Sequence, residues 1–365
     1  MTGLSLPDLR RIEPRVWLLL GLTGVGACLV IIYALALQWP PIGRRDYATY
    51  WLAGRMVLDG ANPYDPQAIS AAARGLSDAN ALQPYFSYPP QALLLFVPLG
   101  ALPLVPSYWT YQAMGFGLFF VAAKPYLPKG FPLLALLSPA AIVSFDFGQS
   151  GMLLAALWLF SFSGSAAATA ALTFRPQLGV LAGFEAVRGR TLIWTFVWLM
   201  LAVAISSALF GIGIWQDWLQ ELQRHSRLLN GNQVGWYRQM PVPLLGYGPI
   251  GWLMFGGAAL FFLSRAFNAF TAATAAILVA PHGFHYDMTA VCFSCAVMLF
   301  DRWNDSSLGQ RVALSAAFLT PALVYFGTWL VPPILLWALY EQAELSRSAA
   351  PDEVGRAHRT RRVQV

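Results

Sequence analysis

Long apolar segments alternate with short polar turns along most of the chain. The first apolar segment runs from Val16 to Leu37 and matches the roughly 20 residues that a helix needs to cross a bilayer. Segments of this kind, some of them shorter, predict about 12 transmembrane or half-membrane helices. The pattern therefore predicts an all-α polytopic membrane protein, with one integral-membrane domain over residues 1–341 and a basic cytoplasmic tail over residues 342–365.

Composition supports this class of protein. Hydrophobic residues make up 57% of the chain and charged residues 11%, and the mean hydropathy is +0.55, which lies outside the range of soluble globular domains. The formal net charge of +6 comes largely from arginines at the two ends and in short loops, so it indicates membrane topology rather than nucleic-acid binding. Cys28, Cys292 and Cys295 lie in apolar segments and are predicted to be buried helix residues.

Basic residues set the predicted orientation, because cytoplasmic turns carry an excess of Lys and Arg. Such residues occur before the first helix and at positions 124–129, 188–190, 265, 302–311 and 356–362. The extracytoplasmic face then receives residues 38–90, 146–151, 174–177, 215–243 and 281–287. Both termini are therefore predicted to be cytoplasmic, in a plasma (inner) membrane of the bacterial type.

Three apolar stretches are interrupted in ways that point to irregular helices. Residues 91–123 contain three prolines, which predict either one kinked crossing or a crossing plus a hairpin. Residues 165–174 and 177–187 are each only about half the length of a spanning helix. Irregular backbone at membrane depth is tolerated where it lines an enclosed or water-filled cavity, so these interruptions favour a site nearby.

Residues 214–244 are predicted to form an extracytoplasmic amphipathic segment. Trp215, Leu219 and Leu222 recur at helical spacing, while polar side chains fill the other face. Two roles stay open for this segment: it recruits a lipid substrate, or it is an amphipathic connector along the membrane surface.

Asp46 follows two arginines directly after the first helix. A carboxylate near membrane depth is costly unless it serves a partner or a reaction. Two interpretations stay open from position alone: Asp46 is functional, or it is an interfacial residue paired with Arg44 or Arg45.

Arg175 interrupts an apolar stretch and precedes Pro176, so it must face a cavity, a counter-ion or an interface. Its guanidinium fork matches the oxygens of a phosphate group. The alternative is a structural ion pair with Asp146 or Asp287.

The segment 281–287 carries His282, His285 and Asp287. This spacing is compatible with a divalent metal, but Pro281 and Gly283 disfavour a helical array of ligands. Hydrogen bonding from either histidine to a phosphate or a hydroxyl is the more economical interpretation, and Asp287 is expected to cap or begin the next helix.

Several short motifs occur in a fixed order along residues 40–290. They are Asp46, Tyr50-Trp51, Asn62-Pro63-Tyr64-Asp65, Tyr88-Pro89-Pro90, Gly148-Gln149, a basic residue before Pro176, and Pro281-His282 with Tyr286-Asp287. Together they resemble glycosyltransferase family 87, whose members include polyprenyl-phosphate-mannose-dependent α-mannosyltransferases of the GT-C superfamily. Two features depart from that pattern: arginine stands at 175 where lysine is usual, and the Gly164-Ser165 turn lacks basic residues.

The resemblance implies a GT-C-type fold and a chemistry for these residues. Asp46 in the large first extracytoplasmic loop would be the general base of an inverting transfer from a polyprenyl-phosphate sugar, without a metal or other cofactor. Arg175, His282 and Arg238 would bind the donor phosphate. The residues expected to bind substrate are Tyr50, Trp51, Asn62, Tyr64, Tyr88, Gln149, His285 and Asp287.

The implied partners are a lipid-linked donor, a lipid or glycan acceptor of the cell envelope, and membrane lipids, with no nucleic acid. Two other classes stay open. A transporter also combines broken helices with intramembrane charges, although no internal repeat with paired interruptions is visible. A flippase-like binder of lipid-linked sugars would use the same cavity without a base.

Overall fold

The computed structural model of the chain describes residues 13–36, 42, 45–76, 85–127, 136–230, 247–281, 283–324 and 328–348. These residues form helices and connecting turns and contain no β-strand, which agrees with the predicted all-α class. The α-helices are α1 (Pro14–Ala36), α2 (Asp46–Leu58), α3 (Pro66–Arg74), α4 (Leu93–Gly100), α5 (Leu104–Ala123), α6 (Pro139–Phe147), α7 (Gly151–Phe162), α8 (Ala166–Ala171), α9 (Pro176–Arg188), α10 (Leu192–Phe210), α11 (Ile214–Asn230), α12 (Gly248–Arg265), α13 (Ala269–Val279), α14 (Thr289–Asp301), α15 (Leu308–Leu323) and α16 (Val331–Ser348). Short 3₁₀ turns are η3 (Pro90–Ala92), η4 (Lys124–Tyr126), η6 (Leu172–Phe174), η9 (His285–Met288) and η10 (Thr328–Leu330).

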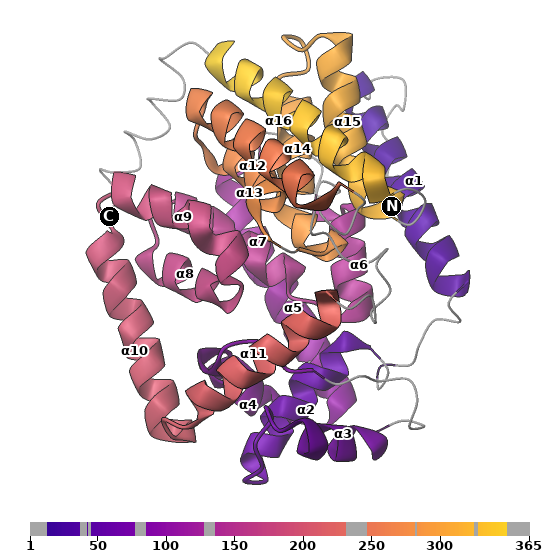
Figure 1. The fold of residues 1–365 in the computed structure, drawn as a ribbon. Helices are drawn as coiled ribbons and strands as arrows, with labels where there is room; N and C mark the ends of the chain where they lie inside the picture. The colour runs from indigo at the N-terminus through magenta and orange to yellow at the C-terminus, as the bar shows by residue number, and fades with distance from the viewer. Residues whose placement is uncertain are drawn as a thin grey trace, which may run out of the picture.

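Figure 1 shows the helices α12–α16 gathered with α1 at one end of the molecule, and α2, α3 and α4 at the other end. Helices α5 and α7 pass between the two ends and contribute buried residues to both. The larger buried cluster is rich in alanine, leucine and phenylalanine from α7, α13, α14 and α16; we refer to it as the main core. The smaller cluster holds Tyr47, Tyr50, Tyr64, Tyr88, Tyr108 and Tyr111; we refer to it as the tyrosine cluster.

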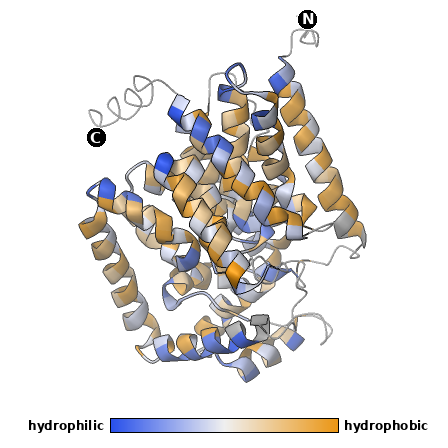
Figure 2. Ribbon diagram, turned by 45° about the horizontal axis from the view of Figure 1, so that its top comes forward, coloured by the Kyte–Doolittle hydropathy of each residue, from blue (hydrophilic) through white to orange (hydrophobic). Residues whose placement is uncertain are grey.

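Two of the described helices are long and apolar enough to cross a membrane. They are the span Pro14–Ile32 of α1 and the span Leu192–Phe210 of α10, each 19 residues long. At 1.5 Å per residue such a helix is about 28 Å long, close to the thickness of a bilayer core. Only 11% of the α10 span is buried inside the protein, and Figure 2 colours most of its ribbon as hydrophobic. An apolar helix exposed in this way suits contact with lipid. The figure of about 12 crossings stays a prediction.

The interrupted apolar stretches fold as separate short helices. Residues 91–123 form α4 and α5, with the break at Ala101–Pro103, where Pro103 precedes the first residue of α5. Residues 165–187 form α8, η6 and α9, and Arg175 is the residue between η6 and α9. Pro176 occupies the first position of α9, where its missing N–H costs nothing. The backbone is therefore broken at the buried arginine.

Most of the described part of the segment 38–90 is helical rather than an extended loop. Helix α2 packs closely against α4 at Gly54. A Cβ at this position would lie 2.0 Å from the Phe96 carbonyl oxygen, so only glycine allows the contact. Asp65 caps α3, accepting hydrogen bonds at Oδ1 from the backbone amides of Gln67 and Ala68. Asp65 thus fixes the start of α3, and the same segment supplies two packed helices.

Two further details refine the sequence-based expectations. Cys292 and Cys295 are buried in α14, but Cys28 is exposed on α1, so the prediction of burial is wrong for Cys28. The reason is that α1 packs against the protein along one face only, with 28% of its span buried.

At the other end of the chain, α16 continues to Ser348, so residues 342–348 of the predicted tail are helical and Gln342 is buried.

Candidate functional site

Asp46 is the first residue of α2, and its side chain is exposed. The unpaired N–H groups and the positive end of the helix dipole stabilise a negative charge at this position. An ionised carboxylate here can accept a proton while remaining open to a molecule outside. The geometry of α2 therefore suits the predicted base.

Gln149 makes a hydrogen bond to the carboxylate of Asp46. Its Nε2 donates to Asp46 Oδ2 at 2.6 Å, and its Oε1 accepts from the hydroxyl of Tyr50 at 2.5 Å. The preceding Gly148 ends α6 in the left-handed conformation, with φ of 68°. A Cβ at Gly148 would lie 2.4 Å from Tyr47 Cβ, so only glycine brings Gln149 this close to α2.

The hydrogen bonds continue from Tyr50 into the protein. The Tyr88 hydroxyl lies 3.3 Å from the Tyr50 hydroxyl and 2.8 Å from Ser150 Oγ. It also accepts from Arg175, at 3.3 Å from Nε and 3.0 Å from Nη2. Asp46, Gln149, Tyr50, Tyr88 and Arg175 thus form one continuous series of polar contacts, which we call the polar chain.

Arg175 and Asp287 close the inner end of the polar chain. Arg175 Nη1 lies 2.9 Å from Asp287 Oδ2, and the side chains are 9% and 0% exposed. The same carboxylate oxygen accepts from the backbone amide of Phe284 at 2.8 Å, and Arg175 Nη2 lies 3.4 Å from the Tyr286 hydroxyl. Of the two carboxylates named for a structural pair with Arg175, the structure selects Asp287. Asp287 also lies in the first turn of η9, as expected.

Burial keeps the hydroxyl of Tyr50 protonated. Desolvation raises the pKa of Tyr50 well above 10, and nearby groups, including Tyr88, add to that rise. Burial likewise raises the pKa of neighbouring Tyr47 to about 12, against a smaller opposite effect from its hydrogen bond to Ser107. The Tyr50 hydroxyl therefore stays a donor to Gln149 at physiological pH.

Arg45 and Asp146 anchor the start of α2. Arg45 Nη1 donates to the Tyr108 hydroxyl at 2.9 Å and lies 3.6 Å from Asp146 Oδ1. Asp146 was one of the two partners open for Arg175, and the structure places it with Arg45 instead. The reason is that Asp146 lies in the last turn of α6, where the Tyr108 hydroxyl, the partner of Arg45, also reaches its backbone carbonyl.

Two predicted substrate contacts, Trp51 and His285, take other positions. The single indole donor of Trp51 bonds to the Leu102 carbonyl at 2.8 Å, which ties α2 to the turn before α5. His285 is 3% exposed and packs edge-on against Phe147. His282 and Arg238 lie outside the described residues, so their predicted contacts with the donor phosphate stay predictions.

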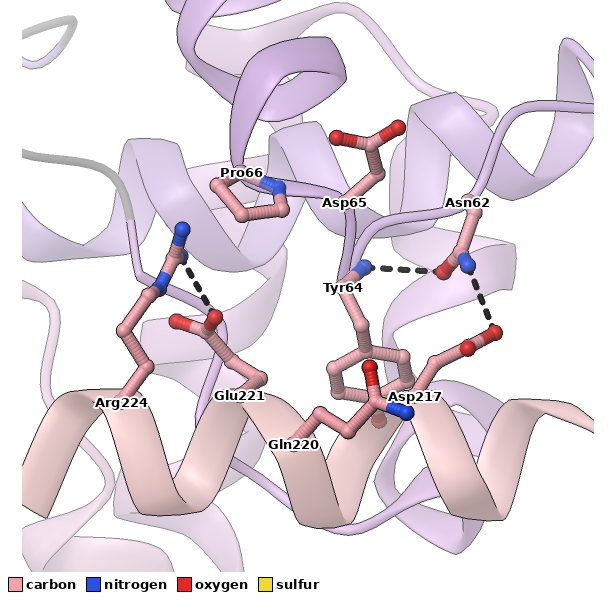
Figure 3. A pocket seen from close by; sticks show the side chains of 8 residues that line it. All are labelled: Asn62, Tyr64, Asp65, Pro66, Asp217, Gln220, Glu221 and Arg224. Atoms are coloured by element: carbon pink, nitrogen blue, oxygen red, sulfur yellow. Dashed lines mark hydrogen bonds and ion pairs between the residues drawn. The ribbon is translucent and has the colours of Figure 1, made fainter.

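Asn62 and Tyr64 lie in a second place, beside α11 (Figure 3). Asn62 Oδ1 accepts from the Tyr64 amide at 3.0 Å, and its Nδ2 donates to Asp217 Oδ2 at 2.8 Å. The Tyr64 hydroxyl donates to the backbone carbonyl of Tyr88 at 2.8 Å. These two residues therefore border a pocket on α11, and Tyr64 reaches the polar chain through Tyr88.

Sequence reasoning missed several residues of this region. Ser150 and Tyr286 contact the polar chain, and Asp217, Gln220, Glu221 and Arg224 line the pocket. The last four follow the i, i+3, i+4, i+7 spacing of one helix face, and Tyr286 belongs to a motif of the family resemblance, so these residues carried a signal in the sequence. Among the described residues no group of three or more His, Cys, Asp or Glu side chains is arranged to hold a metal ion.

An all-helical chain with apolar, lipid-suited surfaces and an exposed carboxylate joined to a buried arginine has the features of a membrane-associated enzyme. The family model for glycosyltransferase family 87 matches residues 86–308, which is more than half of the chain. The chain belongs to glycosyltransferase family 87. Comparisons with curated proteins and with solved structures find no match.

The matched region contains Tyr88, Gln149, Arg175 and Asp287, whereas Asp46 and Tyr50 precede it. Hydrogen bonds from Gln149 and Tyr88 bring these two earlier residues to the matched region. Most residues of the polar chain therefore lie in the region that matches the family, and the other two contact that region directly.

Proposed function

We propose that this glycosyltransferase is a multi-pass membrane enzyme that moves one sugar from a polyprenyl-phosphate donor to a lipid or glycan acceptor. Asp46 acts as the general base, and the reaction takes place on the extracytoplasmic side of a bacterial-type plasma membrane. Mannose is the sugar that the family resemblance favours. No metal or other cofactor takes part in this scheme.

The observation that carries this proposal is the polar chain from Asp46 to Arg175. Its outer end is an exposed carboxylate on a helix N-terminus, and its inner end is a buried guanidinium. A base and a cation held in one hydrogen-bonded frame suit a reaction in which one oxygen loses a proton while another gains negative charge.

The proposed step is a direct displacement. The carboxylate of Asp46 takes the proton from an acceptor hydroxyl as the hydroxyl oxygen forms a bond to the anomeric carbon. The bond from the anomeric carbon to the phosphate oxygen breaks, and its electron pair leaves with the lipid phosphate. Attack opposite the leaving group inverts the anomeric centre.

Arg175 is proposed to bind the departing phosphate through its Nε and Nη2 edge. That edge is the one that makes paired hydrogen bonds with phosphate oxygens, and here both of its nitrogens point to the single oxygen of Tyr88. Asp287 meanwhile holds Nη1, so the guanidinium keeps its orientation when Tyr88 is displaced. Arg175 would thus use different edges for structure and for catalysis.

The test is transfer by purified Asp46→Asn protein in proteoliposomes with radiolabelled polyprenyl-phosphate mannose and an extract of envelope lipids and glycans as acceptor. A general base contributes about 10²- to 10⁴-fold in rate, so transfer should fall by that factor. Asp59→Asn is the matched control, because Asp59 is an exposed carboxylate at the other end of α2 that pairs with Arg55.

Two results would contradict the proposal. Equal transfer by Asp46→Asn and the unsubstituted protein would remove Asp46 as the base. Movement of the intact labelled lipid across the bilayer, without any new glycosidic bond, would favour the transporter or flippase-like class.

A further inference from the structure

A pocket lies between the turn before α3 and one face of α11, outside the polar chain. Its volume is about 330 Å³, and its lining residues are Asn62, Tyr64, Asp65, Pro66, Asp217, Gln220, Glu221 and Arg224. Sites for small molecules span about 300–1,000 Å³, so this pocket is sized for one ring rather than for a whole glycan. Figure 3 shows the α11 side chains directed toward the turn that carries Asn62 and Asp65.

Three polar groups of the pocket have bonding capacity to spare within the described part of the chain. Asp65 uses Oδ1 to cap α3, and Asp217 uses Oδ2 to hold Asn62, so each has a second oxygen for a ligand. Gln220 is exposed and adds an amide that both donates and accepts. These groups come from two elements that the Asn62–Asp217 hydrogen bond locks together.

Glu221 adds a buried acceptor to the pocket wall. The residue is 4% exposed and forms an ion pair with Arg224, at 2.5 Å from Oε2 to Nη2. Its Oε1 is buried and accepts no hydrogen bond from the described residues. A buried carboxylate oxygen in that condition is costly unless a ligand or solvent supplies a donor.

The chemistry of the lining selects a neutral ligand with many hydroxyl groups. The lining carries three carboxylates and one guanidinium, so its net charge is negative and would repel a phosphate or another anion. The carboxylates are not arranged as a metal-binding group among the described residues. The carboxylates and amides of the lining offer hydrogen bonds that suit the hydroxyl groups of a sugar.

The pocket faces away from the apolar side of α11. Leu219 and Leu222, which are 49% and 38% exposed, share a different helix face from Asp217, Glu221 and Arg224, since residues three and four apart lie together. A helix that rests its leucines on lipid therefore turns the pocket toward water. A ligand would enter it from the aqueous side.

Tyr64 connects the pocket with the polar chain. Tyr64 is one of the lining residues, and its buried hydroxyl donates to the backbone carbonyl of Tyr88. The hydroxyl of Tyr88 in turn contacts Tyr50 and Arg175. We propose that this pocket is a subsite for one sugar residue of the acceptor, which it holds from the aqueous side while another hydroxyl reaches Asp46. This inference rests on the proposed function and narrows the acceptor to one that carries a saccharide.

The binding test uses the full chain in detergent and saturation-transfer NMR with methyl α-mannopyranoside, methyl β-glucopyranoside and methyl β-galactopyranoside as probes. At least one glycoside should give a signal that Gln220→Trp, which fills the pocket, reduces at least fivefold. Gln223→Trp is the matched control, because Gln223 is an exposed glutamine of α11 that does not line the pocket. Asp46→Asn should bind the glycoside as the unsubstituted protein does.

The outcomes separate this subsite from the proposed function. Absence of signal for all three glycosides, or a signal that Gln220→Trp leaves intact, overturns the subsite even if the protein transfers sugar. Binding that requires added Ca²⁺ also overturns it, in favour of a cation site. If the glycoside binds and Gln220→Trp abolishes binding while no transfer occurs, the subsite stands and the transferase proposal fails.

Discussion

A carboxylate lies at each end of the polar chain, and the two differ in exposure: Asp46 is its outer end, and Asp287 pairs with Arg175 at its inner end. Asp46 is exposed and receives a hydrogen bond from neutral Gln149, whereas Asp287 is fully buried and paired with Arg175. An open carboxylate can meet a substrate, and a buried one already bonded to a cation and a backbone amide serves to hold that cation. The burial of a carboxylate thus distinguishes a catalytic role from a structural role better than its residue type does.

The largest predicted difference between Asp46 and Asp287 is the loss of protein stability when each carboxylate is removed. Asp287→Ala leaves the Arg175 charge buried without its counter-ion, which costs about 3–5 kcal/mol. Asp46→Ala removes an exposed group and its hydrogen bond from Gln149, so the loss should stay within about 1–2 kcal/mol. Thermal unfolding of the two detergent-purified variants measures the difference.

A double variant controls for cavity formation in that experiment. Arg175→Met combined with Asp287→Leu removes both charges and should recover much of the stability lost in Asp287→Ala. Similar melting temperatures for Asp46→Ala and Asp287→Ala would show that the two ends do not differ as the geometry indicates.

Gln149→Leu tests the positioning of the outer carboxylate. A hydrogen bond to a charged group contributes about 1.5–3 kcal/mol, so sugar transfer should fall roughly 10- to 150-fold. Because Gln149 orients Asp46 without taking its proton, kcat should fall more than the KM for the donor rises. A loss confined to KM would instead support the predicted role of Gln149 as a substrate contact.

Tyr50→Phe tests the next contact along the polar chain. It removes a hydrogen bond between neutral groups, worth about 0.5–1.5 kcal/mol, and should lower transfer by about 2- to 10-fold. In a double-mutant cycle with Gln149→Leu the two losses should not add, because Tyr50 acts through Gln149. Additive losses would separate Tyr50 from the positioning of Asp46.

The smallest effect concerns the pocket on α11, where a carboxylate is buried but close to water. Burial raises the pKa of Glu221 above its ordinary value of 4.5, and Arg224 partly offsets that rise. The folded protein therefore holds this proton more tightly than the unfolded chain, and the associated stability is lost as pH rises through the folded pKa. The melting temperature of Glu221→Gln should increase relative to that of the unsubstituted protein between about pH 4 and pH 7. An unchanged difference over that range would contradict the raised pKa.

Sequence reasoning was most successful where the signal is local. The broken helices around Arg175, the cap at Asp65 and the amphipathic helix α11 follow from prolines, side-chain capping and periodicity within a few residues. The buried position assigned to Cys28 failed, because an apolar segment does not reveal which of its faces meets protein and which meets lipid. The sequence likewise left Asp146 and Asp287 as possible ion-pair partners of Arg175, because an apolar segment does not reveal which side chains its faces meet.

The sequence alone determined the helical class, the family and the candidate residues, because helix periodicity, turn residues and motif order are written in neighbouring positions. Only the tertiary structure decided that Asp287 rather than Asp146 pairs with Arg175, that Gln149 holds Asp46, and that Asn62 and Asp217 enclose a pocket. Those contacts join residues about a hundred or more positions apart in the sequence. Their formation depends on how the helices pack against one another, and no local pattern encodes that packing.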